Sequence, residues 1–117
     1  MVYFSGGSDS AMRVTIRHAD SVHPSLAELA RRRLEFAFWR FGTRVESLRV
    51  RLLDLNGPKG GIDKRCLVAV RLSRPRRLIV IEDMDADAAV AIDRAVGRAA
   101  RSVARAIQTQ RDWPPRY

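Results

Sequence analysis

The stretch DRAVGRAARSVARAI, residues 93–107, carries four arginines at steps of four, three and four residues. At 100° per residue, these steps bring their side chains within about 60° of one another on an α-helix. The arginine stripe consists of Arg94, Arg98, Arg101 and Arg105, and the opposite side carries Ile92, Ala95, Val96, Ala99, Val103, Ala106 and Ile107. The stretch therefore predicts an amphipathic helix with one core face, whose stripe either is merely solvated or binds an anion.

Apolar and polar residues alternate in three segments before this helix, which is typical of half-buried strands. The segments are 12–17 (MRVTIR), 44–54 (RVESLRVRLLD) and 64–72 (KRCLVAVRL). A turn at residues 73–76 leads into a fourth predicted strand, 77–82 (RLIVIE). The residues expected to face the core from these strands are Met12, Val14, Ile16, Leu48, Val50, Leu52, Cys66, Val68, Val70, Leu72 and Val80.

A first helix is predicted between the first two strands, from near Pro24 to residue 41, because proline is tolerated in the first turn of a helix. Its core face is expected to carry Leu26, Ala30, Leu34, Ala37 and Phe41. The second helix should run to about residue 111. Asp85 or Asp87 is expected to cap it, since a carboxylate favours the positive end of the helix dipole.

The predicted order of elements, β-α-β-β-β-α, gives an α+β fold with a four-stranded mixed sheet and both helices packed on one face. The first two strands should be parallel, because a helix crosses between them. Residues 12–111 are expected to form this one domain. Residues 1–11, rich in Gly and Ser, are expected to be a flexible arm, and residues 112–117 a short tail.

The chain has 117 residues, a formal net charge of +9 and a sequence pI near 11.3. This length suits one domain with a modest core. The excess of positive charge points to a polyanionic partner, either a nucleic acid or an acidic membrane surface. Only Lys59 and Lys64 among the 22 basic residues are lysine. The remainder are arginine, whose planar guanidinium donates two parallel hydrogen bonds to a phosphate.

The compartment is predicted from what the sequence lacks. Cys66 is the only cysteine, which excludes an internal disulfide and a thiolate zinc cluster. The N-terminus has no basic segment followed by an apolar run, as a signal peptide would. No apolar stretch approaches the roughly 18 residues that a membrane helix needs. We therefore expect a cytoplasmic protein without a membrane partner.

No residue pattern predicts catalysis. His18 and His23 lie in the first turn region while Cys66 is expected to face the core, so no base reaches a nucleophile. Residues 56–64 (NGPKGGIDK) lead into a strand and lack the Ser or Thr of a P-loop. Residues 82–87 (EDMDAD) lack the glycine and distal Glu of an EF-hand and fit helix capping. We expect no enzyme activity, no metal and no cofactor.

Basic residues accompany the arginine stripe on the predicted helical layer. The first helix adds Arg31, Arg32, Arg33 and Arg40, and the long loop with the strand that follows adds Lys59, Lys64 and Arg65. The open sheet face is expected to carry Arg13, Arg17, Arg49, Arg51 and Arg71. That face has no aromatic residues to stack on bases and the order of elements differs, which excludes an RNA-recognition motif. The residues predict an RNA-binding module that recognises a phosphate backbone by its shape.

Three aromatic residues, Phe36, Phe38 and Trp39, lie partly off the core face of the predicted first helix. They either pack at the sheet edge or against the second helix, or they stack on bases beside Arg32 and Arg40. The sequence leaves both interpretations open.

Two segments resemble a known family. Residues 82–107 (EDMDADAAVAIDRAVGRAARSVARAI) resemble the acidic strand end, the Ala-Ile-Asp and the basic helix of the ribosome hibernation promoting factor and ribosome-associated inhibitor family. Residues 12–45 (MRVTIRHADSVHPSLAELARRRLEFAFWRFGTRV) resemble its first strand and helix. The resemblance covers residues 12–111 and is to the short form, without a C-terminal dimerisation domain. Ala89 replaces the usual aromatic, and the loop at 56–64 is longer and richer in glycine.

The resemblance implies a protein of stationary phase and stress that binds the small ribosomal subunit between head and body. There it would contact ribosomal RNA and neighbouring proteins, compete with mRNA and with A- and P-site tRNA, and silence idle ribosomes. The contacts that it implies are made by Arg31, Arg32, Arg33, Arg94, Arg98, Arg101 and Arg105. Ribosome dimerisation and self-association stay open.

Two other classes of function also stay open from the residues alone. One is a module for RNA or DNA that is not specific to ribosomes. The other is a regulator of a protein partner, which would use Phe36, Trp39 and the open sheet face.

Overall fold

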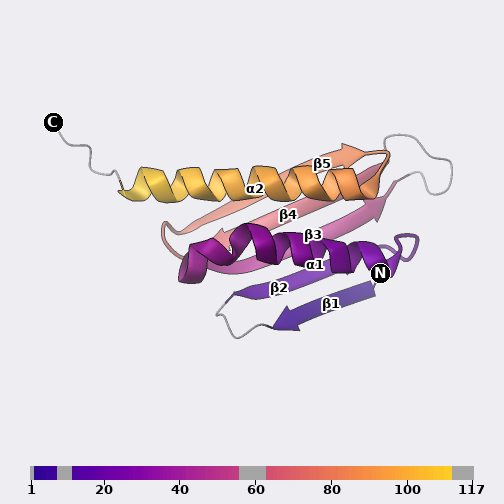
Figure 1. Ribbon diagram of the computed structural model, residues 1–117, viewed down its shortest axis with the longest axis horizontal. Coiled ribbons are helices and arrows are strands. Elements are labelled where there is room, and N and C mark those ends of the chain that lie inside the picture. The colour runs from indigo at the N-terminus through magenta and orange to yellow at the C-terminus, as the bar shows by residue number, and fades with distance from the viewer. Residues whose placement is uncertain (1, 8–11, 56–62, 112–117) are drawn as a thin grey trace.

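The structure, a computed structural model, describes residues 2–7, 12–55 and 63–111 (Figure 1). The elements are β1 (Val2–Gly7), β2 (Arg13–His18), α1 (Pro24–Phe38), the 3-10 helix η1 (Trp39–Arg44), β3 (Val45–Asp54), β4 (Lys64–Leu72), β5 (Arg77–Asp85) and α2 (Ala88–Arg111). The strands form one sheet in the order β1-β2-β3-β4-β5, and both helices lie against one of its faces (Figure 1). The predicted α+β architecture is confirmed.

The pairing of the strands follows from their connections. β2 and β3 are parallel, because α1 crosses between them, whereas β3, β4 and β5 pair antiparallel through short or looped connections. Val50 of β3 lies opposite Ile16 of β2 on one side and Val68 of β4 on the other. Residues directly opposite each other share a face of the sheet, so these three form one apolar row beneath the helices.

Strand β1 is an addition to the four strands that the sequence predicts. The sequence analysis expects a flexible arm here, but residues 2–7 pair antiparallel with β2 along their whole length. The segment has no apolar alternation, which is why the pattern predicts no strand. However, Val2, Tyr3 and Phe4 have high strand propensity, and without β1 the outer edge of β2 would leave its backbone groups unpaired. Residues 1, 8–11, 56–62 and 112–117, with the expected tail and most of the long loop, lie outside the described residues.

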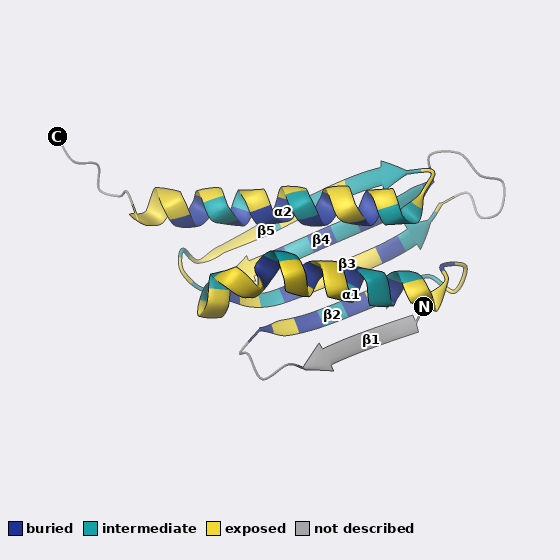
Figure 2. Ribbon diagram, viewed as in Figure 1, coloured by how far each residue is buried: buried dark blue, intermediate teal, exposed yellow. Residues whose placement is uncertain are grey.

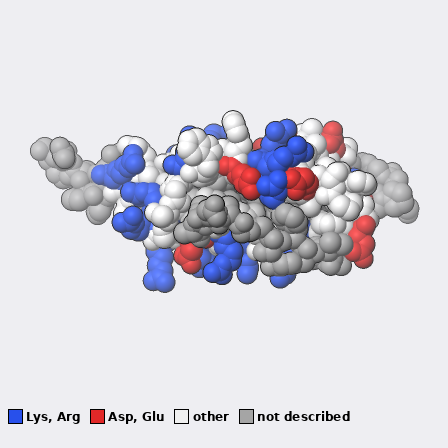
Figure 3. Space-filling model, turned by 60° about the horizontal axis from the view of Figure 1, so that its bottom comes forward, with Lys and Arg blue, Asp and Glu red and all other residues white. Residues whose placement is uncertain are grey.

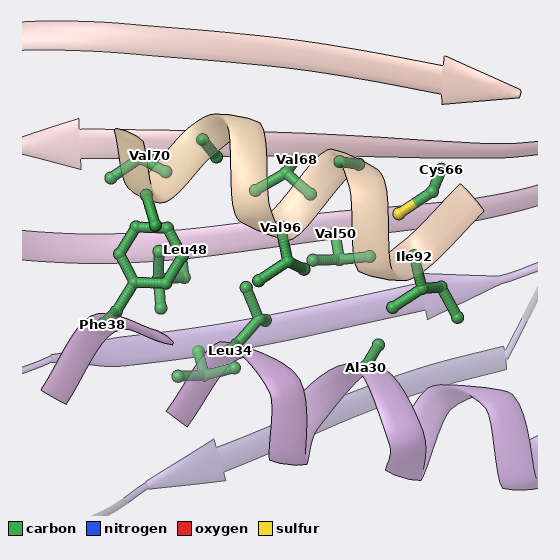
Figure 4. Packing of buried hydrophobic residues seen from close by; sticks show 14 of the residues in the cluster. Ala30, Leu34, Phe38, Leu48, Val50, Cys66, Val68, Val70, Ile92 and Val96 are labelled. Atoms are coloured by element: carbon green, nitrogen blue, oxygen red, sulfur yellow. The ribbon is translucent and has the colours of Figure 1, made fainter. Parts of the chain in front are cut away.

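The core lies between the covered sheet face and the inner faces of both helices (Figure 2). Leu34 and Phe38 of α1 and Ile92 of α2 point into it and are fully buried (Figure 4). The sheet contributes Leu48, Val50, Cys66, Val68 and Val70 (Figure 4). Small residues on α2 (Ala95, Ala99 and Ala106 among them) let this helix pack close to the strands.

The apolar phase of β5 differs from the prediction. Val80 was expected in the core but is 52% exposed, while its neighbours Ile79 and Ile81 pack against the core. Residues 78–81 are all apolar, so the sequence permits either phase of alternation. The register with β4 decides between them, because Ile79 and Ile81 lie opposite the buried Val70 and Val68.

The end of α1 also differs from the prediction. The α-helix ends at Phe38 rather than near residue 41, and η1 continues the chain to β3. Its buried residues are Ala27, Ala30, Leu34 and Phe38. Phe38, expected partly off the core face, is therefore fully buried, whereas Leu26, Ala37 and Phe41 are only partly buried. The four buried residues of α1 are spaced by three, four and four positions, which fits one face of a helix as well as the predicted set of residues does. The packing of α1 on the sheet decides which of the two faces is buried.

Candidate nucleic-acid interface

The arginine stripe lies on α2 as predicted, and its helix begins with the expected cap. The backbone N–H of Ala89 donates to Oδ1 of Asp87 at 2.9 Å, and the Asp87 N–H donates to Asp85 at 2.8 Å. These carboxylates satisfy the first helical donors and lie at the positive end of the helix dipole. The apolar face of α2 is buried from Ala91 to Ile107, which turns the stripe away from the core.

The N-terminal half of the stripe is ion-paired with β5. Arg94 Nη2 donates to Asp85 Oδ1 at 2.9 Å, and Arg94 Nε lies 3.3 Å from Asp83 Oδ1. Arg98 Nη1 donates to Asp83 Oδ2 at 3.2 Å and to the Glu82 carbonyl oxygen at 3.0 Å. On α2 itself, the last three arginines of the stripe have no carboxylate three or four positions away. The partners of Arg94 and Arg98 come from the preceding strand, so spacing along the helix could not predict them.

The C-terminal half of the stripe has no such partners in the part of the chain that the structure describes. Among those residues, Arg105 makes only a long contact of 3.4 Å with the Ser102 hydroxyl. Arg101 has no hydrogen bond or ion pair with any residue in 12–55 or 63–111. Both side chains are exposed. Their positive charge is therefore available to an external anion, while that of Arg94 and Arg98 is locally balanced.

The arginines of α1 divide in a similar way. Arg31 is bonded to Glu28 and Glu35, and the hydrogen bond to Arg31 lowers the pKa of Glu28. Arg33 Nε donates to Asp93 Oδ1 of α2 at 2.8 Å, which ties the two helices together.

The two remaining predicted arginines of this part of the chain form no ion pair with the described residues. Arg32 is exposed, and its charge helps to lower the pKa of Glu28. The guanidinium of Arg40, in η1, lies 4.6 Å from the centroid of the Phe41 ring, a cation–π contact.

The basic residues predicted next to the long loop lie among acids. Lys64 Nζ contacts Asp54 at 3.0 Å and Asp63 at 3.2 Å, and the hydrogen bond to Asp54 is the main cause that raises the pKa of Lys64. Arg65 pairs with Glu82 across the β4–β5 ladder. Lys59 lies outside the described residues.

Arginines that form no ion pair with the described residues gather where α1 and α2 end. We call this region the basic end, and it consists of Arg40, Arg44, Arg101, Arg105 and Arg111. A groove there is lined by residues of η1 and of the last turns of α2, including Phe41, Ala104 and Ile107. Figure 3 shows blue side chains at the same, left-hand end of the molecule.

Two residues of the basic end, Arg44 and Arg111, were not among the predicted site residues. Arg44 donates to the Arg74 carbonyl at 3.0 Å and to Gln110 Oε1 at 2.7 Å, which joins η1, the β4–β5 turn and α2. The sequence could have pointed to Arg111, because this residue lies in the last turn of α2, where a cation complements the negative end of the helix dipole.

Acidic residues gather at the opposite end. We call this the acidic end, and it consists of Asp54, Asp63, Asp83, Asp85 and Asp87. The strand register shows why they meet, because Asp54 lies opposite Lys64, which lies opposite Asp85, where β5 ends. α2 begins beside them and runs to the basic end (Figure 1). The arginines of the basic end are thus separated along α2 from a cluster of acids that is ion-paired with Lys64, Arg94 and Arg98.

The open sheet face carries the predicted arginines as well. Arg13, Arg49 and Arg71 surround one hollow together with Glu46. A second hollow between β2, β3 and β4 is lined in part by Arg17 and Arg51. Figure 3 shows blue side chains along the lower margin of the molecule, consistent with a second basic face.

The side chains considered for catalysis or metal binding are occupied or isolated. Burial raises the pKa of the Cys66 thiol to about 12, with a smaller contribution from Asp83. His23 Nδ1 accepts from the Ser25 N–H at 3.1 Å and so caps α1. No group of three potential metal ligands occurs among the residues that the structure describes. Among the helices described, neither has the length and apolar character to cross a membrane.

Neither a scan of protein-family models nor a search of curated proteins finds a match to the chain. Solved structures do match. The N-terminal domain of Protein Y from Thermus thermophilus is 28% identical, with a TM-score of 0.60 over 77% of this chain and 92% of that chain. A ribosomal subunit interface protein from Coxiella burnetii has the same fold, with a TM-score of 0.63 at 15% identity over 79% and 93%. The resemblance of this chain to the ribosome hibernation promoting factor and ribosome-associated inhibitor family is thereby confirmed.

Proposed function

We propose that this protein is a ribosome-associated translation inhibitor that binds the small ribosomal subunit and silences idle ribosomes. The likeness to the Protein Y domain carries the proposal, because it combines 28% identity with coverage of 92% of that domain. The basic end supplies the physical basis. Exposed arginines without carboxylate partners can bind phosphate oxygens bidentately and release the counterions condensed on RNA.

The ion pairs of some arginines of the stripe determine which part of α2 would contact RNA first. Arg101 and Arg105 need not break any ion pair with the described residues before they meet a phosphate. Arg94 and Arg98 would first have to leave Asp83 and Asp85. We therefore place the main contact with ribosomal RNA at the basic end, with Arg32 extending it along α1. Bound in the mRNA and tRNA channel, the protein would exclude both ligands.

The proposal is tested by co-sedimentation with purified small subunits at several salt concentrations, next to free RNA of similar length. Vacant subunits should bind the protein more tightly than free RNA does, and subunits loaded with mRNA and tRNA should bind it weakly. Purified translation should stop at the protein concentration that saturates vacant subunits. Equal binding to subunits and free RNA would instead favour a general RNA-binding module.

A matched pair of variants separates a specific surface from net charge. Arg101→Ala with Arg105→Ala removes two charges from the basic end, and Arg49→Ala with Arg71→Ala removes two from the open sheet face. The first pair should flatten the log–log salt dependence of binding by on the order of one to two units. It should also abolish inhibition of translation, while the second pair acts weakly. Similar losses for both pairs would reduce the interaction to net charge.

A further inference from the structure

Two large aromatic side chains project from the outer side of α1 and η1 into solvent. Phe36 is 81% exposed and Trp39 is 72% exposed. Exposing two rings of this size forgoes apolar burial that the protein could otherwise use, and neighbouring exposed rings in such a position commonly mark a binding site. Within residues 12–55 and 63–111, neither ring makes a ring contact or cation–π contact.

The backbone fixes these two rings next to each other. The backbone N–H of Trp39 donates to the Glu35 carbonyl oxygen, so the helical hydrogen-bond pattern continues to Trp39, although Phe38 departs from helical geometry with φ −113° and ψ −11°. Residues three apart on a helix lie on the same side, with about 5–6 Å between their Cβ atoms. Phe36 and Trp39 therefore form one exposed apolar surface, which we call the aromatic pair.

The neighbouring aromatics hold the base of this surface in place. Phe38 is fully buried, and its ring centroid lies 5.8 Å from that of Phe41, tilted by 56°. The guanidinium of Arg40 lies over the Phe41 ring. Phe38 and Phe41 thus pack toward the core, while Phe36 and Trp39 are exposed. The exposure of the aromatic pair is built into the packing of η1.

The charges around the aromatic pair select the kind of ligand. Arg32, one turn before Phe36, and Arg40, next to Trp39, form no ion pair with the described residues, although the charge of Arg32 helps to lower the pKa of Glu28. Glu35, the carboxylate closest in sequence, is bonded to Arg31 at 2.7 Å. A flat apolar surface between available guanidinium groups suits a nucleobase with its phosphates, because every base has a π-face and every linkage a negative charge.

We propose that Phe36 and Trp39 are a stacking site for unpaired bases of single-stranded RNA, with Arg32 and Arg40 binding the adjacent phosphates. This site would add a further RNA contact to those made by the basic end. The added contact depends on stacking with bases rather than on charge. The inference deepens the proposed function and rests on it, because the RNA would be a single-stranded segment next to the bound protein.

The first experiment uses the fluorescence of Trp39. Trp113→Phe leaves Trp39 as the only tryptophan, since the sequence has two. Poly(U) supplies unstacked bases with phosphates, and inorganic polyphosphate of matched charge supplies phosphates alone. Poly(U) should quench Trp39 at saturation and polyphosphate should leave it nearly unchanged. Equal quenching by the two polymers, or no quenching by poly(U), would overturn the proposal.

The second experiment measures affinity with the aromatic pair removed. Phe36→Gln with Trp39→Gln keeps every charge and uses a good helix former, and circular dichroism verifies its fold. Its affinity for poly(U) should fall about tenfold or more, which corresponds to about 1.4 kcal/mol or more and is the size expected for lost base stacking. Its affinity for polyphosphate should not change. The matched control is Leu78→Thr with Val80→Thr, which removes two side chains 54% and 52% exposed on the open sheet face.

The salt dependence distinguishes this inference from the proposed function. Loss of stacking should lower the binding constant for poly(U) by the same factor at every salt concentration, so that the slope of the log–log plot against salt stays the same. Loss of arginines should instead reduce that slope. An unchanged poly(U) affinity in the Phe36→Gln, Trp39→Gln protein would refute the stacking site even where ribosome binding persists. Conversely, failure to sediment with small subunits while poly(U) still quenches Trp39 would refute the ribosomal function alone.

Discussion

Cys66 shows how a single buried side chain couples this fold to pH. The residue is 1% exposed beneath the helices (Figure 4), and burial raises the pKa of its thiol to about 12. In the unfolded chain a thiol has a pKa near 8.5. The folded state therefore favours the neutral thiol. This contribution to stability is fully present below about pH 8.5 and is lost as the pH rises toward 12.

We predict that the free energy of unfolding of the native protein falls more steeply in alkali than that of a Cys66→Ala variant. The difference between the two should shrink by on the order of 2 kcal/mol between pH 8.5 and 10.5, because the unfolded thiolate gains a stabilisation that the buried thiol cannot. Urea denaturation at a series of pH values measures it. Parallel pH profiles for the two proteins would show that Cys66 is not the buried neutral thiol described here.

Two glycines test the elements that position the interface. Gly42, in η1, has φ +57° and ψ −134°, a conformation that L-residues rarely adopt, although nothing lies within 4 Å of a Cβ placed there. Gly97, inside α2, has ordinary helical surroundings, and its Cβ would meet only the Arg101 guanidinium at 3.5 Å. Backbone conformation and not space therefore distinguishes the two positions.

Gly42→Ala should destabilise the protein by about 1–3 kcal/mol, because the alanine Cβ strains the turn into β3. Gly97→Ala should stabilise it by about 0.5–1 kcal/mol, since alanine is the better helix former. Thermal and urea denaturation of both variants measure the two effects. The opposite signs are the decisive feature, and a stabilising Gly42→Ala would mean that η1 does not have the described geometry.

The elements show which parts of the fold the sequence could predict. The core face of α2 has a strong helical period, and the face on Ala91 to Ile107 was predicted nearly residue by residue. β5 was predicted as a strand with the wrong face toward the core, because a run of four apolar residues does not show which alternate residues point inward. β1 forms through backbone pairing with an edge strand, for which side-chain patterns give little signal.

The predicted site was limited by contacts between elements. Spacing on α2 correctly placed the four arginines of the stripe on one outward side. It could not show that Asp83 and Asp85 of β5 balance Arg94 and Arg98, since that depends on how the strand lies beside the helix. Likewise, the sequence did not show which of the three aromatic residues Phe36, Phe38 and Trp39 are buried. Only the packing of η1 shows that Phe38 is buried while Phe36 and Trp39 are exposed.

At the scale of the whole molecule, charge is separated between the basic end and the acidic end. Arg94 and Arg105 are 11 residues apart on α2, which corresponds to about 16 Å along the helix. Electrostatic interactions between exposed charges are screened over about 8 Å at physiological ionic strength. RNA bound beside Arg105 would therefore interact little with Arg94, the ion-paired arginine nearest the acidic end.

The most direct measurement compares two double variants of the same helix by co-sedimentation with small subunits over a range of salt concentrations. Arg94→Ala with Arg98→Ala and Arg101→Ala with Arg105→Ala remove the same charge from the same stripe. Only the second pair should reduce the log–log salt slope, by on the order of one to two units. The first pair should mainly lower stability, because Asp83 and Asp85 lose their partners. Equal loss of slope in both variants would contradict the account, since RNA would then lie along the whole stripe.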